Sequence, residues 1–410
     1  MADEGFVYMK ERRLPYPTFD ADNHMYENKD ALTKFIPKEF DGVIKYVEIN
    51  GRTKVAIKDK LSDYIPNPTF NVVAVPGGYN REEGQSAPQQ GKKTDTRGEK
   101  PRIMPSVDAF FDPEPRLELM KDMGIDRALM WPTLASVVEE RLTDDPDAAC
   151  AVVHALNEWM YEHWTYNYSD AIFATPIISL ARMDKAIEEL QRVHERGARC
   201  FLLRVAPVPT YTGRKSFALP QFDPFWELVS ELDIVVGMHS GDSGYQRYIN
   251  DWEGLGDREF RAFVGNGAPG FLALMSEKSN LVDAMASILG HGVASRFPTL
   301  KFAPVEFESS WIRPFVKKLQ RASEKQAVLF DEDPYDVFKR NVWVHIFHDP
   351  DPASLLEILP ADHLMYGSDF PHPEGMGDPL GYSELVEDLP LETQALIMGG
   401  SLGKIMKVDA

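Results

Sequence analysis

The stretch FDPFWELVSELDIVVGMHSG, residues 222–241, joins a helical pattern directly to a strand pattern. In its first half Phe225 and Trp226 lie four and three residues before Val229, which is the spacing of a helix that buries one face. Its second half, residues 234–239, is a short run of β-branched and aliphatic residues that ends in a histidine. When such a unit recurs it predicts a parallel sheet, because a crossover helix is how parallel neighbours connect.

Strand-like runs of the same kind recur through the whole chain. The runs are Thr18–Asp22, Arg127–Trp131, Ile172–Ile177, Cys200–Arg204, Ile234–His239, Leu300–Glu306, Val342–Phe347 and Leu364–Ser368. Helical spacing of apolar residues is found between them at Pro115–Met123, Asp147–Trp164, Asp184–Arg196, Pro224–Leu232, Ser309–Glu324 and Pro352–Leu359. Eight alternating units are typical of a (β/α)8 TIM barrel, an α/β fold, so we expect a single barrel domain over residues 1–410.

One segment, residues 41–110, breaks this rhythm after the first strand. It is far longer than the ~2 to 6 residues of an ordinary connection and is therefore an expected insertion. Within it, Lys45–Ile49 and Thr53–Ile57 flank Asn50-Gly51, which is a type I′ turn signal and predicts a small hairpin. Residues 66–105 are rich in Gly, Pro, Gln and Lys without periodicity, so they predict a long loop that serves as a lid, a subunit contact or a disordered surface segment.

The composition of the 410 residues excludes several classes of partner. There are 44 lysines and arginines against 64 aspartates and glutamates, and a net charge of −20 repels nucleic acid and anionic membranes. Cys150 and Cys200 are too few for a disulfide scaffold or a cysteine-rich zinc module, which fits a reducing compartment. With a charged N-terminal stretch and no run near ~18 apolar residues, a cytoplasmic location is expected.

Metal-ligand and acid/base side chains stand at the ends of four predicted strands, where barrel enzymes carry their chemistry. The first strand ends in Asp20-Ala21-Asp22-Asn23-His24, and alternation sends residues 20, 22 and 24 to one side. The fifth ends in His239, the sixth in Glu306 and the eighth in Asp369. Two histidines and two carboxylates converging at one barrel mouth predict a mixed nitrogen and oxygen site for one divalent Zn, Mn or Fe ion.

The motifs FDADNH (19–24), FDPFWELVSELDIVVGMHSG (222–241), GVASRFPTLKFAPVE (292–306) and LMYGSDFPH (364–372) resemble the amidohydrolase superfamily. The resemblance covers nearly the whole chain. It is to the branch typified by aminocarboxymuconate-semialdehyde decarboxylase and related aromatic-acid decarboxylases.

The resemblance implies four metal ligands. The branch's first-strand H-x-H, which is E-x-H in some decarboxylases, falls on Asp22-x-His24, its fifth-strand histidine on His239 and its eighth-strand aspartate on Asp369. Zinc is the first choice of ion, with Mn or Fe as alternatives, and the carboxylate of Asp22 also suits a harder ion such as Mn or Mg.

The sixth strand departs from the branch. Where the decarboxylases have a histidine that helps to activate a metal-bound water, this chain has Glu306. A bound divalent ion lowers the pKa of its water towards ~7, so we expect Glu306 to act as the base and Asp369, as in the superfamily, to shuttle the proton. His291 falls in the turn before the strand and is interpreted as structural.

Further residues are candidates for substrate contacts. Arg204, at the end of the fourth strand, would compensate an anionic substrate, with Arg247 as a second candidate, and the alternative for either is a salt bridge. His372 would hydrogen-bond the ligands or the substrate, and Tyr245 would wall an aromatic pocket or pack on the barrel rim. Of the pair at 345 and 348, at most one histidine can point inward.

Three functions are compatible with these patterns. The first is a divalent-metal-dependent hydrolase that cleaves a C–N or C–O bond of a small cyclic or aromatic substrate, and the loss of the sixth-strand histidine favours it. The second is a metal-dependent non-oxidative decarboxylase of a hydroxylated aromatic or muconate-like acid. The third is a non-catalytic barrel that binds a ligand or partner. By resemblance the chain is expected to form a homodimer or homotetramer, with residues 41–110 and 309–321 as candidate contact regions.

Overall fold

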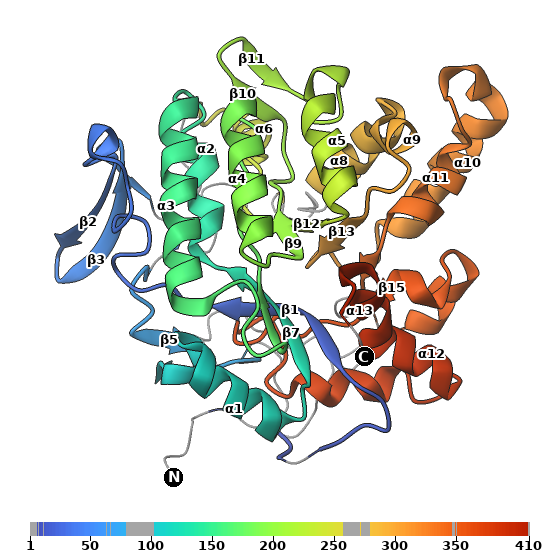
Figure 1. Ribbon diagram of the computed structural model, residues 1–410, viewed down its shortest axis with the longest axis horizontal. Coiled ribbons are helices and arrows are strands. Elements are labelled where there is room, and N and C mark those ends of the chain that lie inside the picture. Colours follow the sequence, from blue (N-terminus) through green and yellow to red (C-terminus); the bar gives the residue numbers. More distant parts are fainter. Residues whose placement is uncertain are drawn as a thin grey trace.

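The computed structural model describes residues 6, 8–10, 12–62, 64–65, 67–78, 102–256, 271, 279–346, 349 and 351–408. Strands and helices alternate along this part of the chain, with helices arranged outside the central strands (Figure 1). Among the described helices, none has both the length and the apolar composition that spanning a bilayer would require.

All eight predicted strand runs contain a strand, which confirms this part of the prediction. The strands are β1 (Phe19–Met25), β7 (Arg127–Pro132), β8 (Ile172–Ala174), β9 (Cys200–Leu202), β12 (Val235–His239), β13 (Phe302–Val305), β14 (Val344–His345) and β15 (Leu364–Met365). They pair in parallel in the groups β1-β7-β8, β9-β12-β13 and β14-β15. Single parallel bridges at Ile177–Leu202, Phe302–Val342 and Asn23–Phe370 connect these groups. Parallel contacts therefore follow the chain order, and the last one leads from the segment after β15 back to β1.

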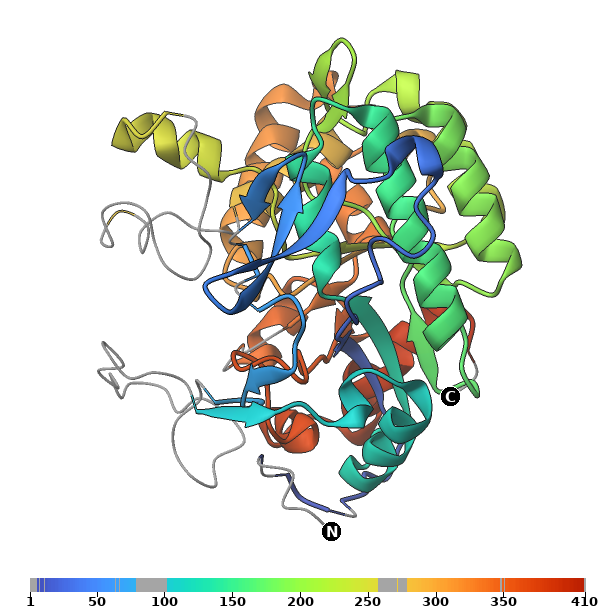
Figure 2. The same ribbon diagram turned by 90° about the vertical axis from the view of Figure 1, so that its left-hand side faces the viewer.

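Helices cover the strands on the outside (Figures 1 and 2). They are α1 (Pro113–Met123), α2 (Val138–Arg141), α3 (Pro146–Trp164), α4 (Met183–Glu195), α5 (Asp223–Leu232), α6 (Gln246–Glu253), α8 (Ser279–Gly290), α9 (Val293–Arg296), α10 (Ile312–Gln326), α11 (Pro334–Asn341), α12 (Leu391–Ala395) and α13 (Ser401–Met406). The expected α-helix at 352–359 is wrong: residues Pro352–Glu357 form a 3-10 helix. Pro360 explains the short element, because the residue before a proline is pushed out of helical geometry.

The segment between β1 and β7 carries two small antiparallel sheets. The predicted hairpin is confirmed as β2 (Ile44–Ile49) and β3 (Arg52–Ile57), and β4 (Lys60–Ser62) extends it. Asn50 and Gly51 have φ of 51° and 72°, as a type I′ turn requires. The hairpin lies beside α3 (Figure 1), where Lys58 pairs with Asp144 and Asp145.

The loop expected at 66–105 contains regular structure near its ends. Short strands β5 (Val72–Ala74) and β6 (Ile103–Pro105) pair antiparallel. The prediction of irregular structure is therefore wrong for these residues. The two strands that pair are about thirty residues apart in the sequence, and a local pattern does not reveal such a pairing. Residues 79–101, the middle of the predicted loop, lie outside the described residues.

Side chains of the central strands form an apolar cluster of their own. Phe19, Leu129, Phe173, Val235 and Met365 come from five different strands and are each at most 3% exposed. Trp131 lies among them, and its Nε1 donates to the carbonyl oxygen of Ala21 at 2.9 Å. Gly237 on β12 leaves room for this indole, because a Cβ at that position would overlap the Cη2 atom of Trp131.

We predict that Gly237→Ala destabilises the protein by about 1–3 kcal/mol, because the closely packed Trp131 ring and the strand backbone cannot both keep their positions. Urea unfolding measures this change. Gly290→Ala is the matched control, since a Cβ at the end of α8 meets no atom within 4 Å. Equal stability of the two variants would show that the space beside Trp131 is not limiting.

Glu27 is fully buried just after β1, and its Oε1 accepts a hydrogen bond from the Leu134 amide at 2.8 Å. Burial raises the pKa of this carboxyl to about 8. Because the folded protein then holds the proton more tightly than the unfolded chain, the resulting stability is complete below about pH 4.3 and is lost as the pH rises through about 8.

Glu27→Gln keeps the acceptor for Leu134 but cannot ionise. Relative to the parent, we expect it to gain on the order of 3 kcal/mol of unfolding free energy between pH 5.5 and pH 9. Urea titrations at the two pH values test this, with Glu392→Gln at the exposed start of α12 as the control. A difference between Glu27→Gln and the parent that does not change with pH would contradict the assignment.

Candidate metal centre

The ends of β1, β12 and β15 bring together the four residues expected to bind a metal. Asp22, His24, His239 and Asp369 are all buried, with at most 8% exposure. The Oδ1 atom of Asp22 lies 3.3 Å from Nε2 of His24 and 3.1 Å from Nε2 of His239. Oδ1 of Asp369 lies 3.3 Å from the same His24 nitrogen. Two imidazoles and two carboxylates therefore face one another.

The donor set fits a divalent cation on observations of the site itself. Asp22 Oδ2, His24 Nε2 and Asp369 Oδ2 are buried and have no hydrogen-bond partner among the described residues. Nδ1 of His239 lies 2.8 Å from the carbonyl oxygen of Ser240, which favours a proton on Nδ1 and leaves the lone pair of Nε2 directed at the site. Nitrogen and oxygen donors of this kind suit Zn, Mn or Fe.

The charges of the site are unbalanced without a cation. Burial by itself raises the pKa of Asp22, but its close contacts with the imidazoles of His239 and His24 hold that pKa well below its ordinary value. Burial and the charges of Glu306 and Asp22 raise the pKa of Asp369 well above its ordinary value. Burial also lowers the pKa of His24 to about 4, so this imidazole is neutral and available as a ligand.

Asp20 supports the metal ligands instead of joining them. Its carboxylate accepts hydrogen bonds from the backbone amides of Asp22, at 3.0 Å, and Ser368, at 2.9 Å, as well as from the Ser368 hydroxyl. Asn23 also donates to it and in turn accepts from the buried Arg116. The carboxylate thus links the end of β1 to the segment after β15. Burial raises the pKa of Asp20 to about 6.

Glu306, the predicted base, lies beside the ligands. Its Oε2 is 3.5 Å from Nδ1 of His239, and it forms an acidic group with Asp369 and Glu374 whose carboxylate oxygens lie within 4.8 Å of one another. Glu374 was missed by sequence reasoning, although it stands two residues after His372 in the same turn and could have been found from that proximity.

The remaining histidines differ in their relation to the site. His372 binds the Oδ1 of Asp369 at 2.7 Å through Nδ1, and its ring centroid lies 4.0 Å from that of His24. His345 also points inward: its Nδ1 accepts from the amide of Glu306 at 3.0 Å and lies 3.5 Å from Oδ2 of Asp22. His348 lies outside the described residues. His291 is remote and contacts Ser216.

The two candidate arginines are engaged with an acidic residue. Arg204 donates through Nη2 to Glu140 and through Nε to the carbonyl oxygen of Asp242 at 2.9 Å, while its Nη1 has no partner among the described residues. Arg247 pairs with the same Glu140. The salt-bridge alternative is thus the arrangement found. Tyr245 lines a cavity between the loops after β9, β12 and β13, with its ring centroid 5.4 Å from that of Tyr248.

Comparison with known proteins identifies the class. A sequence model described as amidohydrolase matches residues 87–400, and the chain therefore belongs to the amidohydrolase family. A search of curated proteins gave no match. Membership of this family implies a TIM barrel.

Solved structures that resemble the chain include amidohydrolases and decarboxylases. Amidohydrolase map2389c from Mycobacterium avium subsp. paratuberculosis K-10 is 30% identical, with a TM-score of 0.86 over 97% of this chain and 99% of that one. The 2,6-dihydroxybenzoate decarboxylase from Rhizobium is 17% identical, with a TM-score of 0.57 over 73% and 90%. A dihydroxybenzoic acid decarboxylase from Polaromonas sp. JS666, with bound manganese, is 16% identical, with a TM-score of 0.54 over 74% and 88%.

We predict about one divalent ion per chain in protein purified without chelator, measured by elemental analysis. His239→Ala should weaken metal affinity at least ~100-fold, since even the partners of ligands contribute 10–100-fold. His291→Ala is the control, because this histidine contacts serines outside the centre. Equal metal content in both variants would refute the ligand assignment.

Proposed function

We propose that this chain is a divalent-metal-dependent hydrolase that cleaves a C–N or C–O bond of a small, uncharged cyclic or aromatic substrate. We further propose that its strands form a closed (β/α)8 barrel with residues 41–110 as an insertion. The observation that supports hydrolysis is the position of the Glu306 carboxylate. It lies beside the proposed ligand His239 and in an acidic group with Asp369 and Glu374.

Asp22, His24, His239 and Asp369 would hold the ion. A bound divalent ion polarises a carbonyl group and makes a water molecule more acidic. Glu306 would take the proton of the attacking water on its Oε2 and pass it to Asp369, whose carboxylate belongs to the same acidic group. Asp369 would return a proton to the leaving atom from Oδ2, because His372 already occupies Oδ1 at 2.7 Å. The backbone amide of Glu306 donates to Nδ1 of His345 at 3.0 Å, which holds the backbone of the proposed base.

Decarboxylation is the second candidate, and the first-strand carboxylate Asp22 favours it because some decarboxylases have E-x-H at this place. Such an enzyme must hold the carboxylate that it removes close to the metal. Here that carboxylate would approach three more acidic groups, namely Glu306, Asp369 and Glu374. Arg204 and Arg247, the cations considered for this task, face Glu140 instead. Repulsion between like charges therefore favours an uncharged substrate.

Glu306→Gln should reduce kcat for an amide or lactone panel by about 10²–10⁴-fold, since a positioned base contributes that much. Metal content should stay unchanged, and the rise of the rate with pH that reports the base should disappear. Glu308→Gln, exposed on the same loop, is the matched control.

Carbon dioxide release from a panel of hydroxybenzoates, run beside the hydrolysis assays, decides between the two reactions. If the protein releases carbon dioxide, and Glu306→Gln does so at the same rate, the result would contradict the hydrolase proposal and support the decarboxylase. Hydrolysis that depends on Glu306, without carbon dioxide release, is the result we expect.

A further inference from the structure

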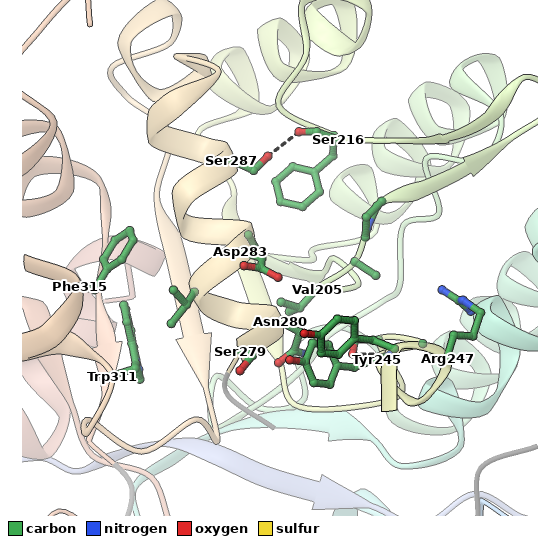
Figure 3. A pocket seen from close by; sticks show the side chains of 18 of the residues that line it. Val205, Ser216, Tyr245, Arg247, Ser279, Asn280, Asp283, Ser287, Trp311 and Phe315 are labelled. Carbon is green, nitrogen blue, oxygen red and sulfur yellow. Dashed lines mark hydrogen bonds between the residues drawn. The ribbon is translucent and has the colours of Figure 1, made fainter. Parts of the chain in front are cut away.

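A cavity of about 930 Å³ lies between the loops that follow β9, β12 and β13 and the helices α8 and α10 (Figure 3). Its volume is at the upper end of the ~300–1,000 Å³ typical of small-molecule sites. Neither Glu306 nor any of the four proposed metal ligands lines it. The cavity is therefore a space additional to the metal centre.

Two of these loops also carry residues of the metal centre. The loop after β12 begins at His239 and then lines the cavity with Ser243 and Tyr245. The loop after β13 begins at Glu306 and continues to Trp311, which is another wall residue. A molecule in the cavity would thus rest on the same two loops as the proposed reaction centre.

Aromatic side chains stand among the polar and aliphatic residues that line the cavity. Phe217, Trp311 and Phe315 are at most 5% exposed and present their rings from the loop before α5 and from the start of α10. Figure 3 shows Trp311 and Phe315 on one side and Tyr245 across from them. Aromatic walls of this kind favour a flat aromatic ring, which stacks edge-to-face or offset on them.

Four charged side chains line the cavity, namely Arg247, Asp251, Asp283 and Lys318. Arg247 lies to one side of Tyr245 in Figure 3 and pairs with Glu140. Lys318 and Asp283 both line the cavity, and burial raises the pKa of Asp283 while Lys318 lowers it. Because Arg247 is paired with Glu140, the two carboxylates Asp251 and Asp283 outnumber the remaining cation Lys318 on these walls, so an uncharged ligand fits better than an anion.

A neutral polar atom on the cavity wall is suited to recognise a ligand. Oδ1 of Asn280, at the start of α8, is buried and accepts no hydrogen bond from any described residue. The nearby hydroxyls of Ser216 and Ser287 bond each other, and His291 completes that group. Asn280 Oδ1 is therefore the acceptor that a ligand N–H or O–H group could satisfy.

We propose that this cavity binds the body of the substrate, namely an uncharged aromatic ring that carries a hydrogen-bond donor, with the ring against Trp311 and the donor on Asn280 Oδ1. This inference rests on the proposed hydrolytic function and adds the substrate class to it. Trp311 and Asn280 are then specificity-determining residues, while the metal centre carries the reaction.

Equilibrium binding tests the proposal with a matched set of probes on the metal-loaded full chain. The probes are 4-hydroxyacetanilide, acetanilide, anionic 4-acetamidobenzoate and non-aromatic N-cyclohexylacetamide. Calorimetry should show 4-hydroxyacetanilide binding at least ~10-fold more tightly than the anionic and non-aromatic probes, the scale of one lost pocket interaction. Equal affinity for all four probes would overturn the proposal.

Two variants and a control separate the contributions. Asn280→Ala should weaken 4-hydroxyacetanilide about 10-fold and acetanilide little, since only the former carries the ring hydroxyl. Trp311→Ala should weaken both about 10-fold. Tyr211→Ala, an aromatic residue 66% exposed outside the cavity lining, should change neither. If Trp311→Ala does not fold, the selectivity change of Asn280→Ala remains decisive, and its absence overturns the proposal.

The cavity assignment and the hydrolase proposal can be contradicted independently of each other. Probes that bind with the predicted dependence on Asn280, while the enzyme releases carbon dioxide and hydrolyses nothing, would keep the cavity assignment and remove the hydrolase proposal. Hydrolysis that depends on Glu306, with binding insensitive to Asn280 and Trp311, would keep the hydrolase and remove the cavity assignment.

Discussion

The buried carboxylate of Asp22, held between the imidazoles of His24 and His239, is the interaction on which the site depends. A carboxylate enters a protein interior only with compensating charge or hydrogen bonds. The imidazoles come from β1 and β12, so the compensation requires these strands to meet at their ends. Asp369, which follows β15, contacts the imidazoles of His372 and His24, yet burial together with neighbouring carboxylates raises its pKa. The site is therefore short of positive charge, which a divalent cation would supply.

The backbone is strained where these acidic side chains are presented. Glu306 and Asp369 have φ of 63° and 55°, in the left-handed region that costs of order 1–3 kcal/mol for residues other than glycine. Each is held there by contacts to the centre: the amide of Glu306 donates to His345, and the amide of Asp369 donates to the Asp22 carbonyl at 2.7 Å. Conformations of this cost persist when the surroundings fix them, and both occur where a strand ends in a proposed functional carboxylate.

The strands and the residues at their ends could be predicted from the sequence. The reason is that the period of apolar residues and the place of a residue at the end of a strand are local properties of the chain. The eight runs, the hairpin at Asn50-Gly51 and the convergence of Asp22, His24, His239 and Asp369 follow from spacing and from the rule that parallel strands end at one edge. The inward direction of His345 could not be predicted, because β14 is only two residues long and the alternation of side chains along so short a strand does not define a face. The Glu140 partner of Arg204 lies 64 residues away and has no signature in the sequence.

This last contact also bears on which substrate the protein can accept. Arg204 and Arg247 share the carboxylate of Glu140, which is 8% exposed at its side chain. A substrate anion that replaced Glu140 on either arginine would leave a buried charge without its partner, which costs several kcal/mol. The arrangement therefore engages Arg247 and the Nη2 atom of Arg204 in ion pairs and ties α6 to α2. An uncharged aromatic ring meets no such cost, because in the cavity it exchanges contact with water for apolar contact with Trp311 and the other aromatic side chains.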